Sequence, residues 1–411
     1  MNLSLRTDRS LLRADARSTR YVLTTIVAPD APPRADRLPV NVALVLDRSG
    51  SMAGARKFAL AREAVEQALR LLGPDDRFAL VVYDDAVDVL ARSTRATPDA
   101  KRRALDALRG VEPRGSTDLC AGWMRGCEQV ANALGAAGIA RALLLTDGLA
   151  NHGETDAQAL ARHAAELRRR GIATSTFGVG EDFDERLLRD LAHEGGGNFY
   201  FIEEPAQIPD LLTSELGEAL SVVVRGATLT LALPDGAEAE VLNRFRSSAT
   251  PRALRIELGD LVSGQEVQAV VRVRFALADR GELAGDATQG GRVGGALEWT
   301  YASHAANDEQ RRDVAVDREV ARVYAARARA DATEANRRGD MGEAQRVLQR
   351  TAARVAQYAG ADAELREVAD ALRDEVPVFA AAMAPRALKM MTFQAESAAK
   401  GRAADGKARR R

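Results

Sequence analysis

Val42-Ala-Leu-Val-Leu46-Asp-Arg-Ser-Gly-Ser51 joins a short, uninterrupted apolar run to a turn of small and polar residues. A continuous apolar run of this length is typical of a strand that is buried on both faces, as strands of a parallel sheet are. In an open α/β sheet, polar turns that follow such strands lie at the carboxyl edge of the sheet. The junction therefore predicts an α/β domain with polar side chains gathered at one edge.

Further apolar runs follow along the chain, and stretches with helical periodicity separate them. Strands that alternate with helices indicate a doubly wound, mostly parallel, Rossmann-like sheet over residues 38–217. The predicted strands are Val42–Leu46, Phe78–Tyr83, Ala142–Thr146, Ala173–Gly178 and Asn198–Ile202, with Val87–Leu90 as a short edge strand. The predicted helices are Arg56–Leu72, Pro98–Leu108, Leu119–Leu134, Asp156–Arg170 and Phe183–His193.

After Leu216 the pattern changes to runs in which apolar and polar residues alternate. Alternation with a period of two predicts strands with one face in the core, as in an antiparallel β-sandwich. The β-branched run Tyr21–Val27 fits the same sheet, so we expect the α/β domain to be inserted within the sandwich. The later strands are expected at Val222–Val224, Ala227–Leu233, Ala253–Leu258, Glu266–Phe275 and Gly295–Tyr301.

The last hundred residues are rich in Ala, Arg, Glu and Gln and show helical periodicity. Helices are expected at Asp313–Arg338, Gly342–Tyr358 and Ala361–Glu375, with Pro377 ending the last one. The tail from Arg386 to Arg411 has eight Lys or Arg against one Glu and one Asp, a net charge of +6. Its small and basic residues after Gln394 predict disorder.

These patterns divide the chain into five segments. Residues 1–37 supply the N-terminal strand of the sandwich, residues 38–217 the α/β domain, and residues 218–305 the rest of the sandwich. Residues 306–377 form a helical hairpin or bundle, and residues 378–411 a basic, partly disordered tail.

The overall composition limits the class of protein. An apolar fraction of 46% and a charged fraction of 28% over 411 residues are those of a globular protein with two or three domains. A net charge of −1 argues against general nucleic-acid binding. Two cysteines are too few for a disulfide framework. With neither a transmembrane stretch nor an apolar secretory signal in the sequence, we expect a cytoplasmic protein.

Oxygen donors gather where the predicted strands end. Asp47, Ser49 and Ser51 alternate along an extended turn, so their side chains can converge on one point. Thr117 lies in a loop that leads into a helix, and Asp147 follows the strand Ala142–Thr146 directly. Carboxylates and hydroxyls are hard donors that suit Mg²⁺, and Mn²⁺ or Ca²⁺ would also accept them. We therefore predict a metal site at this edge, although each hydroxyl taken alone could simply cap a helix.

Leu46-Asp-Arg-Ser-Gly-Ser-Met52, together with Gly-Ser-Thr117 and Leu-Thr-Asp-Gly148, resembles a von Willebrand factor type A domain with a metal-ion-dependent adhesion site. The resemblance covers about residues 38–217. It implies that Ser49, Ser51 and Thr117 contact the metal and that Asp47 and Asp147 act directly or through water. It also implies that a carboxylate of a bound partner fills the sixth coordination position. The flanking strands and helices are similar to bacterial cytoplasmic proteins in which a type A domain is embedded in a β-sandwich.

The resemblance implies a metal-dependent protein-binding module and not an enzyme. Its partner would be a protein that presents an Asp or Glu, and a multisubunit ATPase is one such partner by analogy with some intracellular type A proteins. Two alternatives remain open. A hydrolase could use the metal to activate water, although two-metal chemistry needs more carboxylates or histidines than are placed here. A scaffold could instead work through the C-terminal helices and basic tail.

Two charged groups near the predicted site have weaker interpretations. Arg48 lies between two predicted ligands, and contact with an acidic partner or a plain exposed position fit the sequence equally. Asp84, Asp85 and Asp88 cluster near a strand end, where a solvated loop is the favoured interpretation.

Overall fold

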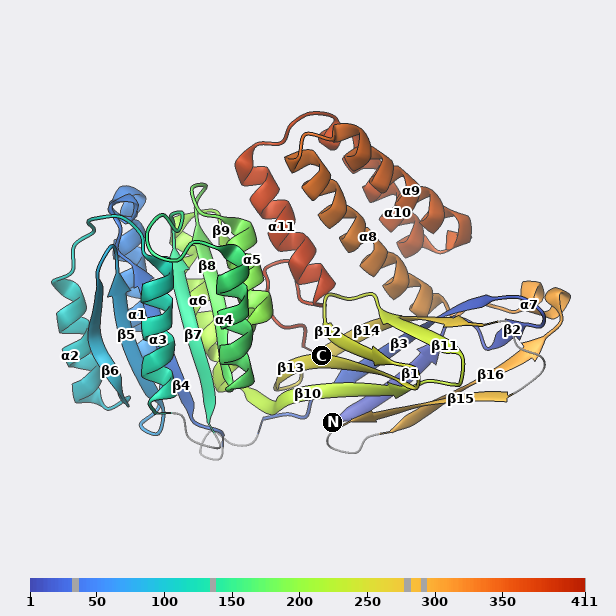
Figure 1. Cartoon of the computed structure of the whole chain (residues 1–411), viewed down its shortest axis with the longest axis horizontal. Coiled ribbons are helices and arrows are strands. Elements are labelled where there is room, and N and C mark those ends of the chain that lie inside the picture. Colours follow the sequence, from blue (N-terminus) through green and yellow to red (C-terminus); the bar gives the residue numbers. More distant parts are fainter. Residues whose placement is uncertain (32–36, 134–137, 277–281, 290–293, 411) are drawn as a thin grey trace. The chain divides into compact units, whose positions relative to one another are not determined.

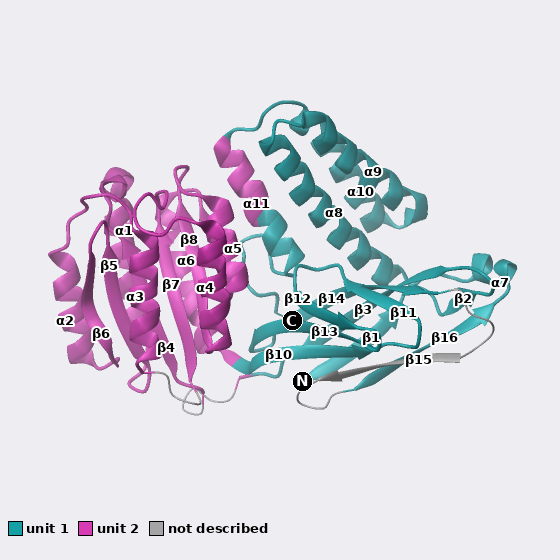
Figure 2. Ribbon diagram, viewed as in Figure 1, with its two compact units in different colours: residues 1–30, 223–384, 394–411 teal, residues 31–222, 385–393 magenta. Residues whose placement is uncertain are grey.

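A computed structural model describes residues 1–31, 37–133, 138–276, 282–289 and 294–410, and it divides the chain into two compact units (Figure 2). One unit, teal in the figure, combines Met1–Asp30, Val223–Ala384 and Gln394–Arg411. The other, magenta, consists of Ala31–Val222 and Pro385–Phe393. The chain therefore leaves the first unit after an early strand, builds the second, and returns.

A six-stranded sheet with the order β6-β5-β4-β7-β8-β9 forms the centre of the second unit (Figure 1). All neighbouring strands are parallel except β5 and the edge strand β6. Because α1 and α6 cover one face and α3, α4 and α5 the other, the inner strands are buried on both sides, as their apolar runs predict. The strands are β4 (Val40–Asp47), β5 (Arg77–Tyr83), β6 (Val87–Arg95), β7 (Ile139–Thr146), β8 (Ile172–Val179) and β9 (Gly196–Ile202).

Helices α1 to α5 lie close to the predicted positions, whereas helix α6 was not predicted. The helices that follow these strands are η2 (Gly50–Arg56), α1 (Lys57–Leu71), α2 (Pro98–Arg109), α3 (Leu119–Ala131), α4 (Ala157–Arg169), α5 (Glu185–Glu194), η3 (Pro205–Gln207) and α6 (Ile208–Leu220). Asp and Thr side chains cap the first turns of α2, α3, α4 and α5. The residue Leu134, predicted as the end of α3, lies outside the described residues. The prediction of a doubly wound α/β domain is confirmed.

Two sheets make the β-sandwich of the first unit, with the orders β1-β3-β14-β11 and β12-β13-β10-β15-β16-β2. Their inner faces share one apolar core, which includes Ile26, Leu229, Ile256 and Trp299. The strands are β1 (Asn2–Thr7), β2 (Leu11–Arg13), β3 (Ser18–Val27), β10 (Val222–Ala232), β11 (Ala237–Val241), β12 (Arg246–Thr250), β13 (Ala253–Val262), β14 (Glu266–Phe275), β15 (Glu282–Gln289) and β16 (Gly295–Ala302).

The sandwich departs from the prediction in three respects, and the first is that strands β11, β12 and β15 were not predicted. Strand β3 joins it as expected by pairing with β14, but β1 and β2 come from a segment expected to supply a single apolar strand. Strand β2 has only three residues and is too short to show a pattern, whereas β1 does alternate apolar and polar residues and the prediction overlooked it. Strand β2 also pairs with β16 in parallel, so the second sheet is not wholly antiparallel.

Three long helices complete the first unit. Residues of α8 (Val314–Arg337) pack against the outer face of the first sheet, where Val316, Val320 and Val323 meet Tyr21 and Val270. Helix α9 (Met341–Ala359) and helix α10 (Ala363–Glu375) then pack on α8. The short helices α7 (His304–Glu309) and η4 (Val376–Ala380) flank this group.

The tail does not have the disorder that we predicted after Gln394. Helix α11 (Pro385–Ala399) continues through this position, and its first nine residues belong to the α/β unit (Figure 2). Lys389 is 4% exposed and its Nζ lies 2.8 Å from Glu185 Oε2, while the ring of Phe393 packs against Phe199. Acidic residues of the domain pair with two of the basic residues, Lys389 and Arg386, an effect that composition alone does not reveal. No helix among the described residues is both long and apolar enough to cross a bilayer, and the cytoplasmic location stays a prediction.

Candidate metal site

The two predicted carboxylates lie at the carboxyl ends of neighbouring parallel strands. Asp47 is the last residue of β4, and Asp147 follows the last residue of β7. In the register of this pair, Leu46 is opposite Leu145, so the two strands end at the same level. The chain proceeds from β4 to β5 in one direction and from β7 to β8 in the other. The carboxylates therefore flank the switch point, where α/β sheets bind ligands.

A chain of hydrogen bonds connects four of the five predicted donors. The Ser49 N–H donates to Asp47 Oδ1 at 2.7 Å, and the Ser49 and Ser51 hydroxyls lie 3.0 Å apart. Ser51 Oγ in turn donates to Asp147 Oδ1 at 2.6 Å. These contacts place two carboxylates and two hydroxyls within one hydrogen-bonded group.

The fifth donor, Thr117, reaches the group from the loop before α3. A Cβ placed on Gly148 would lie 3.4 Å from Thr117 Oγ1 and 3.7 Å from Ser51 Oγ, so both hydroxyls face the same glycine. The Asn151 side chain accepts a hydrogen bond from the Thr117 N–H at 3.0 Å, which fixes this loop. Among the five, Ser51 is exposed and the other four are buried, so the group opens to solvent at Ser51.

Asp47 is held by burial and by two hydrogen bonds. It is fully buried, and burial raises the pKa of its carboxyl to about 6. Hydrogen bonds from Thr146 Oγ1, at 2.6 Å, and from Ser49 act in the opposite direction, because they stabilise the charged form. Thr146 was not predicted as a site residue, although it directly precedes Asp147 in the sequence.

Lys57, the first residue of α1, was also missed. Its Nζ lies 2.5 Å from Asp147 Oδ2 in a largely buried ion pair. A lysine at a helix start gives no signal in the sequence that it turns toward a strand end. The charged side chains of this hydrogen-bonded group are those of Asp47, Asp147 and Lys57. Their formal charges sum to −1 before any metal is added.

Arg48 is buried, and its side chain forms ion pairs within the domain. Its side chain is 7% exposed and contacts Asp84 Oδ2 at 3.1 Å and Asp88 Oδ2 at 2.7 Å. Arg114 Nε also donates to Asp84 Oδ2 at 2.8 Å. The interpretation of the aspartates as a solvated loop is therefore wrong for Asp84, which is fully buried. This pair holds the β4 turn against the end of β5.

Comparison with known proteins identifies the domain in which these residues lie. The family model of the von Willebrand factor type A domain matches residues 41–214. This chain contains a von Willebrand factor type A domain. It is 28% identical over 219 residues to the uncharacterized protein YfbK of Escherichia coli (strain K12), covering 53% of this chain and 36% of that protein. It is 24% identical over 278 residues to the uncharacterized protein sll0103 of Synechocystis sp., covering 65% of this chain and 64% of that protein.

Similarity extends beyond the type A domain in a solved structure. The von Willebrand factor type A protein from Catenulispora acidiphila superposes with a TM-score of 0.69 at 19% identity, covering 92% of this chain and 89% of that one. At this identity the likeness concerns the fold alone. It includes most of the chain outside the type A domain, whereas the chain spans 36% and 64% of the lengths of the two bacterial relatives.

Proposed function

We propose that Asp47, Ser49, Ser51, Thr117 and Asp147 hold a divalent cation of the Mg²⁺ type, with Mn²⁺ or Ca²⁺ as substitutes. The observation that carries the proposal is the convergence of five oxygen donors from three chain segments at the switch point of the sheet. Hard oxygen donors with room for water match the coordination that Mg²⁺ prefers. The cation would supply a Lewis-acid point of attachment for an anionic group.

The charge of the group favours an acidic partner. Two carboxylates and Lys57 sum to −1, so a divalent cation would bring the site to +1. A single Asp or Glu from a partner protein would then neutralise it. Because Ser51 is the exposed donor, the partner would approach from its side. An ATPase assembly is a candidate partner only through the resemblance of the domain to intracellular type A proteins.

We infer that the domain is a binding module and not a hydrolase. Metal-dependent hydrolysis in two-metal sites uses several carboxylates or histidines around the reacting group. The described side chains that contact Asp47 and Asp147 are instead hydroxyls and Lys57. None of these supplies a general base beside the pair.

Titration calorimetry of Mg²⁺ and Mn²⁺ into the metal-free chain tests the metal assignment. We expect binding to the wild type and at least about tenfold weaker binding to Asp47→Ala and Ser51→Ala, since each loses an oxygen donor. Ser51 is exposed, so its substitution leaves the core intact. Asp182→Ala, which removes an exposed carboxylate after β8, is the matched control. Equal binding heats in wild type, Asp47→Ala and Ser51→Ala would refute the site.

A pull-down in Mg²⁺ and in EDTA tests the partner. The captured protein is expected to be released by EDTA, to be lost with Ser51→Ala, and to depend on one of its own acidic residues. Retention in EDTA would show that the metal site is not the binding surface. Retention of the partner after truncation at Pro377 would show that the C-terminal tail is not the binding surface.

A further inference from the structure

A cavity lined by charged side chains lies in the unit that contains the β-sandwich, between the first sheet and helices α8 and α9. It has a volume of about 300 Å³. Its lining contains five arginines and no acidic residue: Arg9, Arg272, Arg274, Arg312 and Arg354. They come from the turn after β1, from β14, from the segment before α8 and from α9, so the fold gathers them from four places in the sequence.

Four of these arginines have carboxylates behind them, outside the cavity lining. Arg9 pairs with Asp8 at 3.3 Å, Arg272 with Glu240 at 2.5 Å and Arg312 with Asp317 at 2.5 Å, while Arg274 lies 3.9 Å from Glu238. The five arginines of the lining carry a charge of +5, and the four carboxylates that pair with them carry −4. Such pairs hold the guanidinium groups in place, and each guanidinium keeps further N–H groups that the carboxylate does not use.

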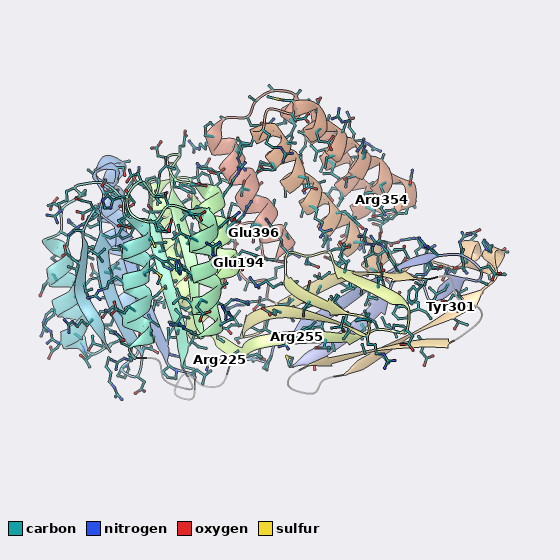
Figure 3. The ribbon with its side chains drawn as sticks, viewed as in Figure 1. Glu194, Arg225, Arg255, Tyr301, Arg354 and Glu396 are labelled. Atoms are coloured by element: carbon teal, nitrogen blue, oxygen red, sulfur yellow. The ribbon has the colours of Figure 1, made fainter. Side chains whose placement is uncertain are left out.

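Arg354 has no carboxylate partner among the described residues. Its guanidinium carbon lies 5.0 Å from the centre of the Tyr324 ring, and its Nη2 donates to Tyr21 Oη at 3.2 Å (Figure 3 labels Arg354). An arginine held by two tyrosines without a counter-ion leaves most of its donors for a ligand. Arg272 Nε is a second such donor, since it is buried and no acceptor lies within reach in the described part of the chain.

Tyrosine hydroxyls add neutral donors to the same cavity. Burial raises the pKa of Tyr358 to about 12 and that of Tyr21 still further, so both stay protonated at neutral pH. Tyr21 Oη lies 3.2 Å from Tyr324 Oη, which orients both groups. A lining of guanidinium and phenol groups offers hydrogen-bond donors to an oxyanion and little to a cation.

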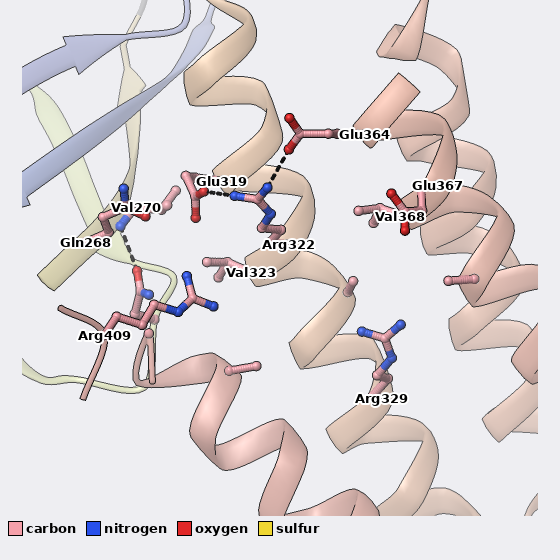
Figure 4. Close-up of a pocket in the computed structure, with 15 residues that line it drawn as sticks. Gln268, Val270, Glu319, Arg322, Val323, Arg329, Glu364, Glu367, Val368 and Arg409 are labelled. Atoms are coloured by element: carbon pink, nitrogen blue, oxygen red, sulfur yellow. Dashed lines mark hydrogen bonds and ion pairs between the residues drawn. The ribbon is translucent and has the colours of Figure 1, made fainter. Parts of the chain in front are cut away.

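Another cavity of this unit provides a contrast. It has a volume of about 410 Å³ and also contains arginines, but carboxylates line it as well (Figure 4). Arg322 pairs there with both Glu319 and Glu364 (Figure 4). Its charges are balanced internally, whereas those of the arginine cavity are not.

We propose that the arginine cavity binds the phosphate group of a small molecule. Arginine presents a planar fork that matches phosphate oxygens, and the volume is at the lower limit of small-molecule sites. The guanidinium groups of Arg354 and Arg312 already lie over the rings of Tyr324 and Tyr358, at 5.0 and 5.2 Å. The bases of a nucleic acid could stack on these tyrosine rings only by displacing the two guanidinium groups. A compact, polar phosphate ester therefore fits the cavity better than a nucleic acid.

Titration calorimetry at constant ionic strength tests this site with inorganic phosphate and glycerol 1-phosphate, and with glycerol as the neutral control. Both phosphates are expected to bind the wild type, and glycerol 1-phosphate is expected to bind more tightly than inorganic phosphate. Glycerol is not expected to bind. Arg354→Met is expected to weaken binding at least tenfold. Arg350→Met, an exposed arginine of the same helix, is expected to bind as the wild type does.

Arg354 is exposed, so its substitution is expected to leave the fold intact, and the thermal melt of each variant checks this. Arg354→Lys keeps the charge without the fork and is expected to bind with intermediate affinity. The proposal is overturned if the wild type binds no phosphate, or if Arg354→Met binds it as tightly as Arg350→Met does. It is also overturned if only duplex DNA binds, with a steep salt dependence, because the arginines would then serve a polyanion.

Discussion

At the scale of single residues, the sequence predicts that the five oxygen donors converge, because each follows a buried strand or precedes a helix, while their role as metal ligands stays a prediction. Their chemistry and their place in the chain are both local. Lys57 and Arg48 could not be predicted in the same way, since local sequence does not tell which charged side chain turns inward. Their burial depends on carboxylates 90 and 36 residues away, and the fold alone brings these together.

Arg48→Ala is expected to destabilise the type A domain by about 3 kcal/mol, because it removes one of the two arginines that pair with the buried carboxylate of Asp84. Urea unfolding of the full chain measures this loss. Arg102→Ala removes an exposed arginine that pairs with Asp99 three residues away, and it should cost under about 0.5 kcal/mol. If the two variants lose equal stability, the Arg48 pair is not an internal support of the site.

At the scale of elements, strands buried on both faces and long helices could be predicted, since their periodicity persists over many residues. The prediction missed strands β1, β2, β11, β12 and β15 and helices α6 and α11. In β1, polar side chains point outward along an edge strand, and in α11 the ion pair with Glu185 compensates a basic residue. Strand β2 and helix α11 are stabilised by contacts with residues far along the chain and carry little signal of their own.

Asp76 illustrates how a single side chain ties elements together. Its carboxylate accepts hydrogen bonds from the Val40 N–H at 2.9 Å and the Gly73 N–H at 2.7 Å, and from Arg37 Nη1 at 2.8 Å. Burial acts to raise the pKa of Asp76, but these hydrogen bonds and the Arg37 charge outweigh it, and the pKa is lowered. The first strand of the sheet is thus fastened where it begins.

Asp76→Asn is expected to lower stability by about 2–3 kcal/mol at pH 7, because the amide cannot pair with the Arg37 charge. A lowered pKa means that the charged form contributes stability above the ordinary carboxyl pKa of about 4. This contribution is lost as the pH falls through the still lower pKa of the folded state, so wild type and variant should converge below pH 4. Asp75→Asn, at the exposed neighbouring position, is the control. A stability difference that persists unchanged into acid would contradict the charge argument.

At the scale of the whole molecule, the insertion of the type A domain into the sandwich could be predicted from one apolar strand, Tyr21–Val27, that had no place in the α/β pattern. Each resulting unit has its own core and its own candidate ligand site: the metal site in one and the arginine cavity in the other. The two sites therefore report on different parts of the chain.

Scanning calorimetry of the full chain is accordingly expected to resolve two unfolding transitions. Mg²⁺ at a hundred times its dissociation constant should stabilise the type A transition by about 2.7 kcal/mol and leave the other unmoved. Phosphate should act on the second transition alone. Asp47→Ala should abolish the first shift and Arg354→Met the second, each without affecting the other. The alternative outcome is a single transition whose midpoint temperature is raised by either ligand. It would mean that the two units unfold together, because stabilising either site would then stabilise the entire chain.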